Sequence, residues 1–293
     1  MTVSKKMAGI LLTAAVATAL AACGGDTPTT DPGGTEQPAE TTFADGTTMA
    51  ALNSAGTITI GTKFDQPLFG LMGPDGNPEG FDVEIGKIIA SELGIAEDKI
   101  EWTETVSQNR EPFIQNGNVD IVIATYTIND TRKEVIDFAG PYYIAGQSFL
   151  VPKGNPAGIT TPDTVGDNTI CTVTGSTSEK NILEYTDASK LITVDKYSDC
   201  LEPIRTGEAA ALTTDNVILA GLVSTSGDEF EVVDATFTEE PYGIGLEKGD
   251  DEFRGFINDV LEKSFEDGRW VAAWEKTAGT VLPTPEPPTV DRY

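Results

Sequence analysis

Short apolar runs with the period of a β-strand recur along the chain, separated by longer segments with the period of an α-helix. Residues 57–61 alternate as Thr-Ile-Thr-Ile-Gly, which predicts a strand. Residues 121–124, Ile-Val-Ile-Ala, are apolar throughout, which favours a strand covered on both faces. Further strands are predicted at residues 169–173 and 209–212. Strands that alternate with helices in this way are typical of an α/β protein.

Two of the predicted helices carry long apolar stripes. The first is expected to begin with Asp82 as its N-cap and to stop at Gly94, and the second is predicted over residues 251–270. Their stripes consist of Ile85, Ile88, Ile89 and Leu93, and of Phe253, Phe256, Ile257, Val260, Leu261 and Phe265. We interpret both stripes as core and assign neither helix a functional role.

Residues 120–132 join a buried strand to a cluster of hydroxyls and one arginine. Thr125 and Thr127 follow the strand at a spacing of two, so both hydroxyls project to one side. Asn129 or Asp130 is expected to cap a helix with Arg132 in its first turn. Because a cation there opposes the helix dipole, the pattern indicates an anion held by the guanidinium and free N–H groups. The alternative is an ordinary strand–loop–helix junction with a solvated arginine.

Two more cations occur in similar places. Asn109 is expected to cap a helix that runs to Asn116, which makes Arg110 a second cation at a helix start. Two independent occurrences are harder to explain as solvated arginines. Lys63 directly follows the strand at 57–61, at the carboxyl end where open α/β sheets bind ligands. A surface lysine is the equal alternative.

Length and charge narrow the function. The 293 residues suggest about two domains, and the hydrophobic content of 39% is that of a globular protein. The formal charge is -28, from 47 acidic and 19 basic residues, so nucleic acid is not an expected partner. An anionic ligand would depend on local cations within about one Debye length, roughly 8 Å. The absence of histidine excludes nucleophiles activated by histidine, zinc sites that contain histidine, and histidine general bases.

The amino-terminal residues 1–22 predict an export signal, because Lys5 and Lys6 precede a short apolar run. The ending Leu-Ala-Ala-Cys at residues 20–23 resembles a bacterial lipoprotein signal. The resemblance implies cleavage before Cys23 and a lipid on its sulfur; a plain secretory signal with a chance cysteine is the alternative. Residues 23–48 contain almost nothing apolar and are expected to form a flexible tether.

Residues 80–93, Gly-Phe-Asp-Val-Glu-Ile-Gly-Lys-Ile-Ile-Ala-Ser-Glu-Leu, fit the signature of the polar amino-acid solute-binding proteins of ABC importers, extracellular solute-binding protein family 3. Residues 120–138 resemble the same family's strand, ligand loop and arginine helix, and the chain is most similar to its glutamate-binding lipoproteins. The resemblance implies an α/β, two-lobed, periplasmic-binding-protein-like fold of type 2 (Venus-flytrap). Each lobe is expected to be a mixed sheet flanked by helices, with two crossover strands. The expected limits are 49–143 with 242–280 for lobe 1, 144–241 for lobe 2, and 281–293 for a Pro-rich tail.

The resemblance also assigns roles to residues of the first lobe. Arg132 and Thr127 match the positions that take the ligand's α-carboxylate, with Thr125 beside them. Most relatives have glycine where Thr125 stands, so this sequence departs from the pattern there. Ser107 and Arg110 match members that bind acidic amino acids, where these residues hold the side-chain carboxylate. Lys63 falls where those members carry a basic residue.

The second lobe supplies the other half of the expected site. Gly175, Ser176 and Thr177 precede a helix, and their hydroxyls and N–H groups make a second half-site for a carboxylate, with a simple N-cap as the alternative. Asp215 matches the family's aspartate that accepts the α-ammonium group, although an aspartate before a helix is also a common cap. Tyr197 is a weaker candidate for a side-chain contact.

Cys171 and Cys200 are the only cysteines besides Cys23. An exported chain meets oxidising conditions, so with Cys23 lipidated the other two are expected to pair, two free thiols being the alternative. A disulfide closing this loop would contribute roughly 3.6 kcal/mol in the chain-entropy model.

Together these features predict an extracytoplasmic, lipid-anchored, monomeric receptor at the cell membrane, without catalytic residues, metal or cofactor. It would capture an acidic amino acid, L-glutamate, by hinge closure and deliver it to an ABC permease. The alternatives are glutamine or another polar amino acid as ligand, a sensor that presents its ligand to a membrane receptor, and a dehydratase-like enzyme on the same fold.

Overall fold

The described part of the chain is residues 42–293, in a computed structural model. The predicted signal peptide, Cys23 and most of the predicted tether lie outside these residues. Near the start of the described segment, the ring of Phe43 packs edge-on against Phe256, and helix α1 (Thr48–Ala55) follows. No helix in residues 42–293 combines the length and apolar character that crossing a membrane requires.

The first of two large sheets contains the predicted strands at 57–61 and 121–124. Its order is β5-β1-β6-β13-β7, with β1 parallel to β5 and β6, and β13 antiparallel to β6 and β7. The strands are β1 (Ile58–Thr62), β5 (Ile100–Glu104), β6 (Ile121–Val122), β7 (Asp137–Ala145) and β13 (Glu240–Leu246). A small sheet of β2 (Asp65–Gln66), β3 (Gly70–Met72) and β4 (Pro78–Glu79) follows β1. The helices of this lobe are α2 (Phe81–Glu92), α3 (Arg110–Gln115), α4 (Asp130–Lys133), α8 (Asp251–Asp267) and α9 (Arg269–Lys276).

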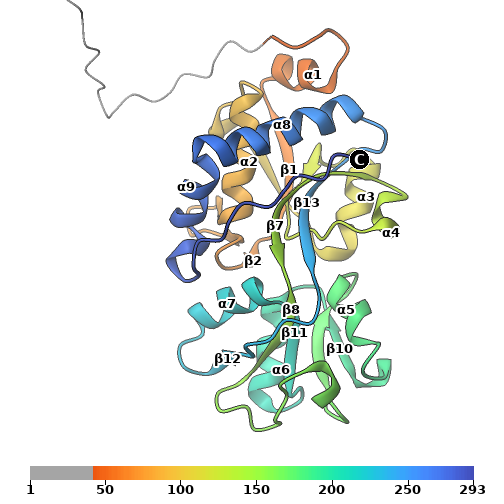
Figure 1. The fold of residues 1–293 in the computed structure, drawn as a ribbon, viewed down its shortest axis with the longest axis vertical. Coiled ribbons are helices and arrows are strands. Elements are labelled where there is room, and N and C mark those ends of the chain that lie inside the picture. The colour runs from red at the N-terminus through yellow and green to blue at the C-terminus, as the bar shows by residue number, and fades with distance from the viewer. Residues whose placement is uncertain (1–41) are drawn as a thin grey trace, which may run out of the picture. The chain divides into compact units, whose positions relative to one another are not determined.

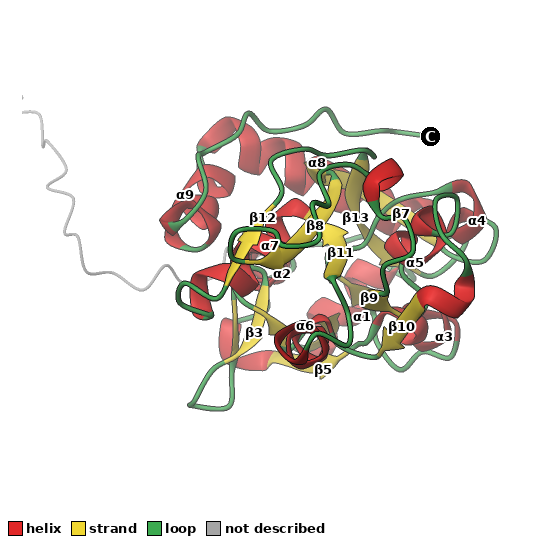
Figure 2. Ribbon diagram, turned by 90° about the horizontal axis from the view of Figure 1, so that it is seen from below, coloured by secondary structure: helices red, strands yellow, loops and turns green. Residues whose placement is uncertain are grey.

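The second large sheet has the same mixed character. Its order is β10-β9-β11-β8-β12, with β9 parallel to β10 and β11, and β8 antiparallel to β11 and β12. The strands are β8 (Gln147–Pro152), β9 (Ile170–Val173), β10 (Leu191–Val194), β11 (Ala211–Asp215) and β12 (Phe230–Val232). The helices are α5 (Thr177–Ile182), α6 (Leu201–Thr206) and α7 (Asn216–Thr225), and in the view of Figure 2, in which the lobes overlap, most helices surround the strands. Short 3-10 turns include Ser107–Asn109 and Tyr197–Cys200.

Two crossing segments join the sheets, as Figure 1 shows. Strand β7 leaves the first sheet and continues almost directly into β8, and β13 returns beside it, with Glu240 paired to Ala145. This arrangement confirms the predicted two-lobed α/β fold with two crossover strands. We call the part around β1 the first lobe and the part around β8 the second lobe; the residue limits assigned from the sequence stay a prediction.

The residues of both apolar stripes belong to the main core or pack against it, as predicted, but one predicted helix is two. Phe81 of α2 packs edge-on against Trp270 and Trp274 of α9, with ring centroids 5.6 and 5.1 Å apart. The helix predicted over 251–270 ends at Asp267, because Gly268 adopts the left-handed conformation (φ 85°) and α9 starts after it. The disulfide between Cys171 of β9 and Cys200 is confirmed, with an S–S distance of 2.01 Å.

The Pro-rich tail runs back across the first lobe (Figure 1) and covers the edge of its sheet. The N–H of Asp291 donates to the carbonyl of Gly140, and the N–H of Phe138 donates to the Tyr293 hydroxyl, each at 2.9 Å. Val290 is buried in the main core. Since β7 is the edge strand of its sheet, the tail occupies hydrogen-bonding groups that an open edge would expose.

Candidate functional site

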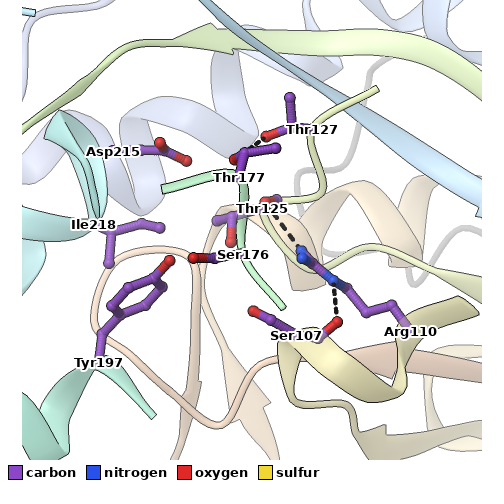
Figure 3. Close-up of a pocket in the computed structure, with 9 residues that line it drawn as sticks. All are labelled: Ser107, Arg110, Thr125, Thr127, Ser176, Thr177, Tyr197, Asp215 and Ile218. Carbon is purple, nitrogen blue, oxygen red and sulfur yellow. Dashed lines mark hydrogen bonds between the residues drawn. The ribbon is translucent and has the colours of Figure 1, made fainter. Parts of the chain in front are cut away.

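A small cavity lies between the lobes, where the strands of both sheets end. Eight of its nine lining residues were predicted from the sequence: Ser107, Arg110, Thr125, Thr127, Ser176, Thr177, Tyr197 and Asp215, the ninth being Ile218. In Figure 3, Ser107 and Arg110 lie on the opposite side of the cavity from Asp215 and Tyr197. The remaining three candidates, Lys63, Arg132 and Gly175, contact these lining residues or their neighbours. That any of them touches a ligand stays a prediction.

Thr125 occupies a strained backbone position that a buried carboxylate holds in place. Its φ of 45° lies in the left-handed region, which favours glycine over residues with a Cβ. Its N–H donates to Asp82 Oδ2 at 2.8 Å, and Asp82 Oδ1 accepts from the Tyr142 hydroxyl at 2.6 Å. The prediction that Asp82 caps its helix is therefore wrong: the N-cap of α2 is Gly80. Burial raises the pKa of Asp82 to about 7.

Arg132 is buried between the lobes rather than solvated. Asn129 provides the cap that the sequence left open, since its side chain accepts from the Arg132 N–H at 2.9 Å. The guanidinium donates from Nε to Glu111 Oε1 at 3.0 Å and from Nη1 to the Thr127 carbonyl at 2.6 Å. Nη2 reaches the Gly175 carbonyl of the second lobe at 3.4 Å. Burial, and after it the Arg110 charge, lowers the pKa of Arg132 to about 10.

Two further cations, Arg110 and Lys63, form hydrogen bonds with Ser107. Arg110 donates from Nε to the Ser107 carbonyl and from Nη1 to the Ala124 carbonyl, each at 3.2 Å. Lys63 Nζ donates to Ser107 Oγ at 2.9 Å. Lys63 is only 3% exposed, so the surface-lysine alternative is wrong, and burial followed by the Arg110 charge lowers its pKa to about 7. We call Lys63, Arg110 and Arg132 the cation cluster.

The turn at 175–177 combines capping with contacts across the cavity. Ser176 is the N-cap of α5 and accepts from the Glu179 N–H at 2.9 Å, so the capping role given as the alternative is present. The Gly175 N–H donates to the Glu179 carboxylate at 2.7 Å. Thr177 Oγ1 donates to Glu240 Oε2 at 2.9 Å and lies 3.5 Å from Thr127 Oγ1 of the first lobe. Thr177 is thus the member of the turn that directly approaches the opposite lobe through its hydroxyl.

Asp215 presents an unsatisfied carboxylate oxygen. It is the N-cap residue of α7, yet its side chain makes no capping hydrogen bond. Oδ2 accepts from the Tyr242 hydroxyl at 2.6 Å, whereas Oδ1 is buried without a hydrogen-bond partner among residues 42–293. Burial, and after it the Glu240 charge, raises the pKa of Asp215 to about 7. A buried carboxylate in this state is stabilised by a cationic donor.

Sequence reasoning missed several residues of this region. Neither Glu240 nor Ile218 was among the candidates predicted from the sequence. Tyr126 lies between Thr125 and Thr127, and period two predicted that it points away from them. The one feature of the sequence that could have drawn attention to Tyr126 is an aromatic residue between two candidate ligand-binding threonines. Across residues 42–293, no group of three or more histidine, cysteine, aspartate or glutamate residues could hold a metal ion.

The geometry suits a small zwitterion. The first lobe contributes the buried cation cluster, and the second contributes the Asp215 oxygen that has no partner in the described part of the chain. Arginine and lysine side chains are donors only, so groups that bind them must accept hydrogen bonds. A ligand with carboxylate at one side and ammonium at the other would satisfy both walls.

Known proteins resemble this chain over most of its length. The family model described as "Bacterial extracellular solute-binding proteins, family 3" matches residues 58–280. The glutamate-binding protein GluB of Corynebacterium efficiens is 39% identical over 229 residues, 75% of this chain and 78% of that protein. The ABC transporter glutamine-binding protein GlnH of Bacillus subtilis is 37% identical over 231 residues, 78% of this chain and 84% of that protein.

Solved structures agree with the fold. An ancestral arginine-binding protein bound to glutamine superimposes with a TM-score of 0.70 at 33% identity, covering 76% of this chain and 97% of the other. The ancestral amino acid-binding protein AncCDT-1, a precursor of cyclohexadienyl dehydratase, gives a TM-score of 0.70 at 30% identity, covering 79% and 99%.

Proposed function

Because the chain belongs to family 3 of the bacterial extracellular solute-binding proteins, we propose that it captures L-glutamate and delivers it to an ABC importer. Binding of a polar amino acid outside the cytoplasm is the function of the family. The observation that carries the finer proposal is the cation cluster: Arg110 lines the cavity, and the buried Lys63 and Arg132 contact its lining residues, opposite the Oδ1 of Asp215, which has no hydrogen-bond partner among residues 42–293. A dicarboxylic amino acid has the complementary charges.

Each end of the ligand has a proposed place. Arg132, Thr127 and the turn at 175–177 take the α-carboxylate, and Asp215 takes the α-ammonium. Lys63, Ser107 and Arg110 take the distal carboxylate with Thr125 beside them, and Tyr197 contacts the ligand's side chain from the opposite side of the cavity. Hydrogen bonds to charged groups contribute about 1.5 to 3 kcal/mol each, so a few suffice for the roughly 8 kcal/mol of micromolar binding after ordering costs.

The distal subsite favours a carboxylate over an amide. Lys63 and Arg110 only donate, and Ser107 Oγ already accepts from Lys63. A glutamine side chain would direct its own N–H donors at these groups or leave one of them without an acceptor, and either arrangement costs affinity. Glutamine is still the second candidate, because glutamine-binding relatives are nearly as similar to this chain as glutamate-binding ones.

Calorimetric titration of the protein with L-glutamate and L-glutamine tests this proposal. We expect glutamate to bind more tightly, and Arg110→Ala to weaken glutamate by about 10- to 150-fold, the equivalent of one charged hydrogen-bonding group. Arg205→Ala is the matched control, because Arg205 is an exposed arginine of the second lobe. If Arg110→Ala weakens glutamate no more than glutamine, the assignment of the distal subsite is wrong.

Closure of the lobes would couple binding to delivery. Contacts between the lobes occur at the cavity and at its rim: Arg132 with Gly175, Gln108 with Asp195, and Lys196 with Glu104. A ligand held by residues of both lobes stabilises the closed state alone and shifts the population towards it. A permease that recognises the closed state would then receive only the loaded protein.

The anchoring proposal rests on the sequence around Cys23. We propose that lipid on Cys23 holds a monomeric receptor at the cell membrane, and metabolic labelling with palmitate that disappears in Cys23→Ser tests it. A sensor would bind the same ligand without supporting uptake, which transport assays in cells distinguish. A dehydratase-like enzyme would convert a prephenate-like acid, and turnover of such an acid would establish it.

A further inference from the structure

Two arginines of the cation cluster share one aromatic ring. The guanidinium carbon of Arg110 lies over the Tyr126 ring at 4.1 Å from its centroid, and that of Arg132 lies over the same ring at 4.8 Å. Tyr126 is completely buried, in a small core cluster where its ring meets that of Phe138 edge-on with centroids 4.8 Å apart. The ring is therefore a fixed body to which both cations are held.

The two contacts limit how the arginines can move. A desolvated cation over an aromatic ring gains roughly 2 kcal/mol, and both arginines are at most 7% exposed. Arginine side chains have many rotamers, and two like charges in one cavity repel each other. Since each guanidinium packs against the same buried ring, the ring fixes the position of both groups and opposes any independent movement of either.

The backbone adds to this fixation. Tyr126 lies between Thr125, whose N–H is held by the buried Asp82, and Thr127, whose carbonyl accepts from Arg132. Glu111, the residue after Arg110 in α3, holds Arg132 Nε at 3.0 Å. The ring thus has a defined place relative to both helices that carry the arginines.

We propose that Tyr126 is a positioning residue that fixes the separation of Arg110 and Arg132 and thereby selects the length of the dicarboxylate ligand, L-glutamate over L-aspartate. The inference rests on the proposed function, in which the two arginines hold opposite ends of the ligand. The carboxylates of aspartate are one methylene closer together, so with the cations held apart only one of them is met well. Without the ring the arginine side chains adapt to the shorter ligand.

The test compares the affinities of both amino acids in three variants by calorimetry. Tyr126→Leu removes the ring, Tyr126→Phe keeps it, and Tyr185→Leu makes the same change at an exposed tyrosine of the second lobe. We expect Tyr126→Leu to weaken glutamate by more than about tenfold and aspartate by clearly less, so that the ratio of the two dissociation constants shrinks. Tyr126→Phe should restore the wild-type ratio, and Tyr185→Leu should not alter it.

The ratio separates positioning from a structural role. Loss of core packing alone would weaken both amino acids by the same factor, and that result for Tyr126→Leu would overturn the inference. Tyr126→Met, which fills the core without a ring, provides the same comparison if Tyr126→Leu does not fold. Wild-type protein that binds aspartate as tightly as glutamate also overturns the inference, whereas wild-type protein that binds neither refutes the proposed function itself.

Discussion

Substitution of Asp215 by asparagine changes the charge of one buried carboxylate and little else. Asparagine has nearly the same size, and its Oδ1 can accept the hydrogen bond that the Tyr242 hydroxyl now donates at 2.6 Å. The variant loses the oxygen that has no partner in the described protein and gains an N–H group in its place. We expect opposite effects on ligand binding and on stability.

The stability effect follows from the pKa. A rise from 3.8 to about 7 means that the folded protein keeps the proton of Asp215 over a range where the unfolded chain has lost it. The stability that this proton provides is complete below pH 3.8 and is lost as pH rises through about 7, a total of about 4 kcal/mol. Asp215→Asn should therefore be more stable than wild type by up to about 4 kcal/mol at pH 8, with the difference vanishing near pH 4.

The binding effect has the opposite sign. The α-ammonium would lose a charged acceptor and face a donor, so glutamate should bind about 10- to 150-fold more weakly. Urea denaturation between pH 4 and 8 and calorimetry with glutamate measure both quantities. Asp187→Asn, at an exposed position of the second lobe, is the matched control. A loss of affinity below about threefold would refute the ammonium role, and equal stability of variant and wild type across this pH range would refute the burial argument.

Three other regions give measurable expectations. At pH 7, glutamate binding should take up roughly half a proton more than glutamine binding, because an added carboxylate raises the pKa of Lys63 above its value of about 7. Calorimetry in buffers of different ionisation enthalpy measures the proton uptake, and equal uptake for the two ligands would contradict this expectation. The double substitution of Cys171 and Cys200 by alanine should lower the free energy of unfolding by about 3.6 kcal/mol in denaturant titrations, and an unchanged stability would show that the cross-link contributes nothing. Deletion of residues 283–293 uncovers the β7 edge and the core position that Val290 fills. We therefore expect the free energy of unfolding to fall by about 2 kcal/mol with little change in glutamate affinity. A loss of affinity with unchanged stability would instead assign the tail to the binding site.

Local patterns predicted the elements that depend on local forces. Alternation and apolar runs located β1 and β6, and the capping pattern located Asn129 before Arg132, because strand period and N-caps involve neighbours in the chain. The break of the last long helix was missed although Gly268 gave a signal for it. Counting cysteines in an exported chain was enough to predict the disulfide.

What the sequence determined by itself is the α/β class with its main strands, the family signature, and a set of candidate residues for binding a charged amino acid. Only the tertiary structure decided which contacts the polar and aromatic side chains around the cavity make. Asp82 holds Thr125 rather than capping its helix, Asp215 bonds to Tyr242 and leaves one oxygen free, and Tyr126 carries two arginines. Hydrogen bonding and charge burial depend on which distant groups meet, and no local period encodes that.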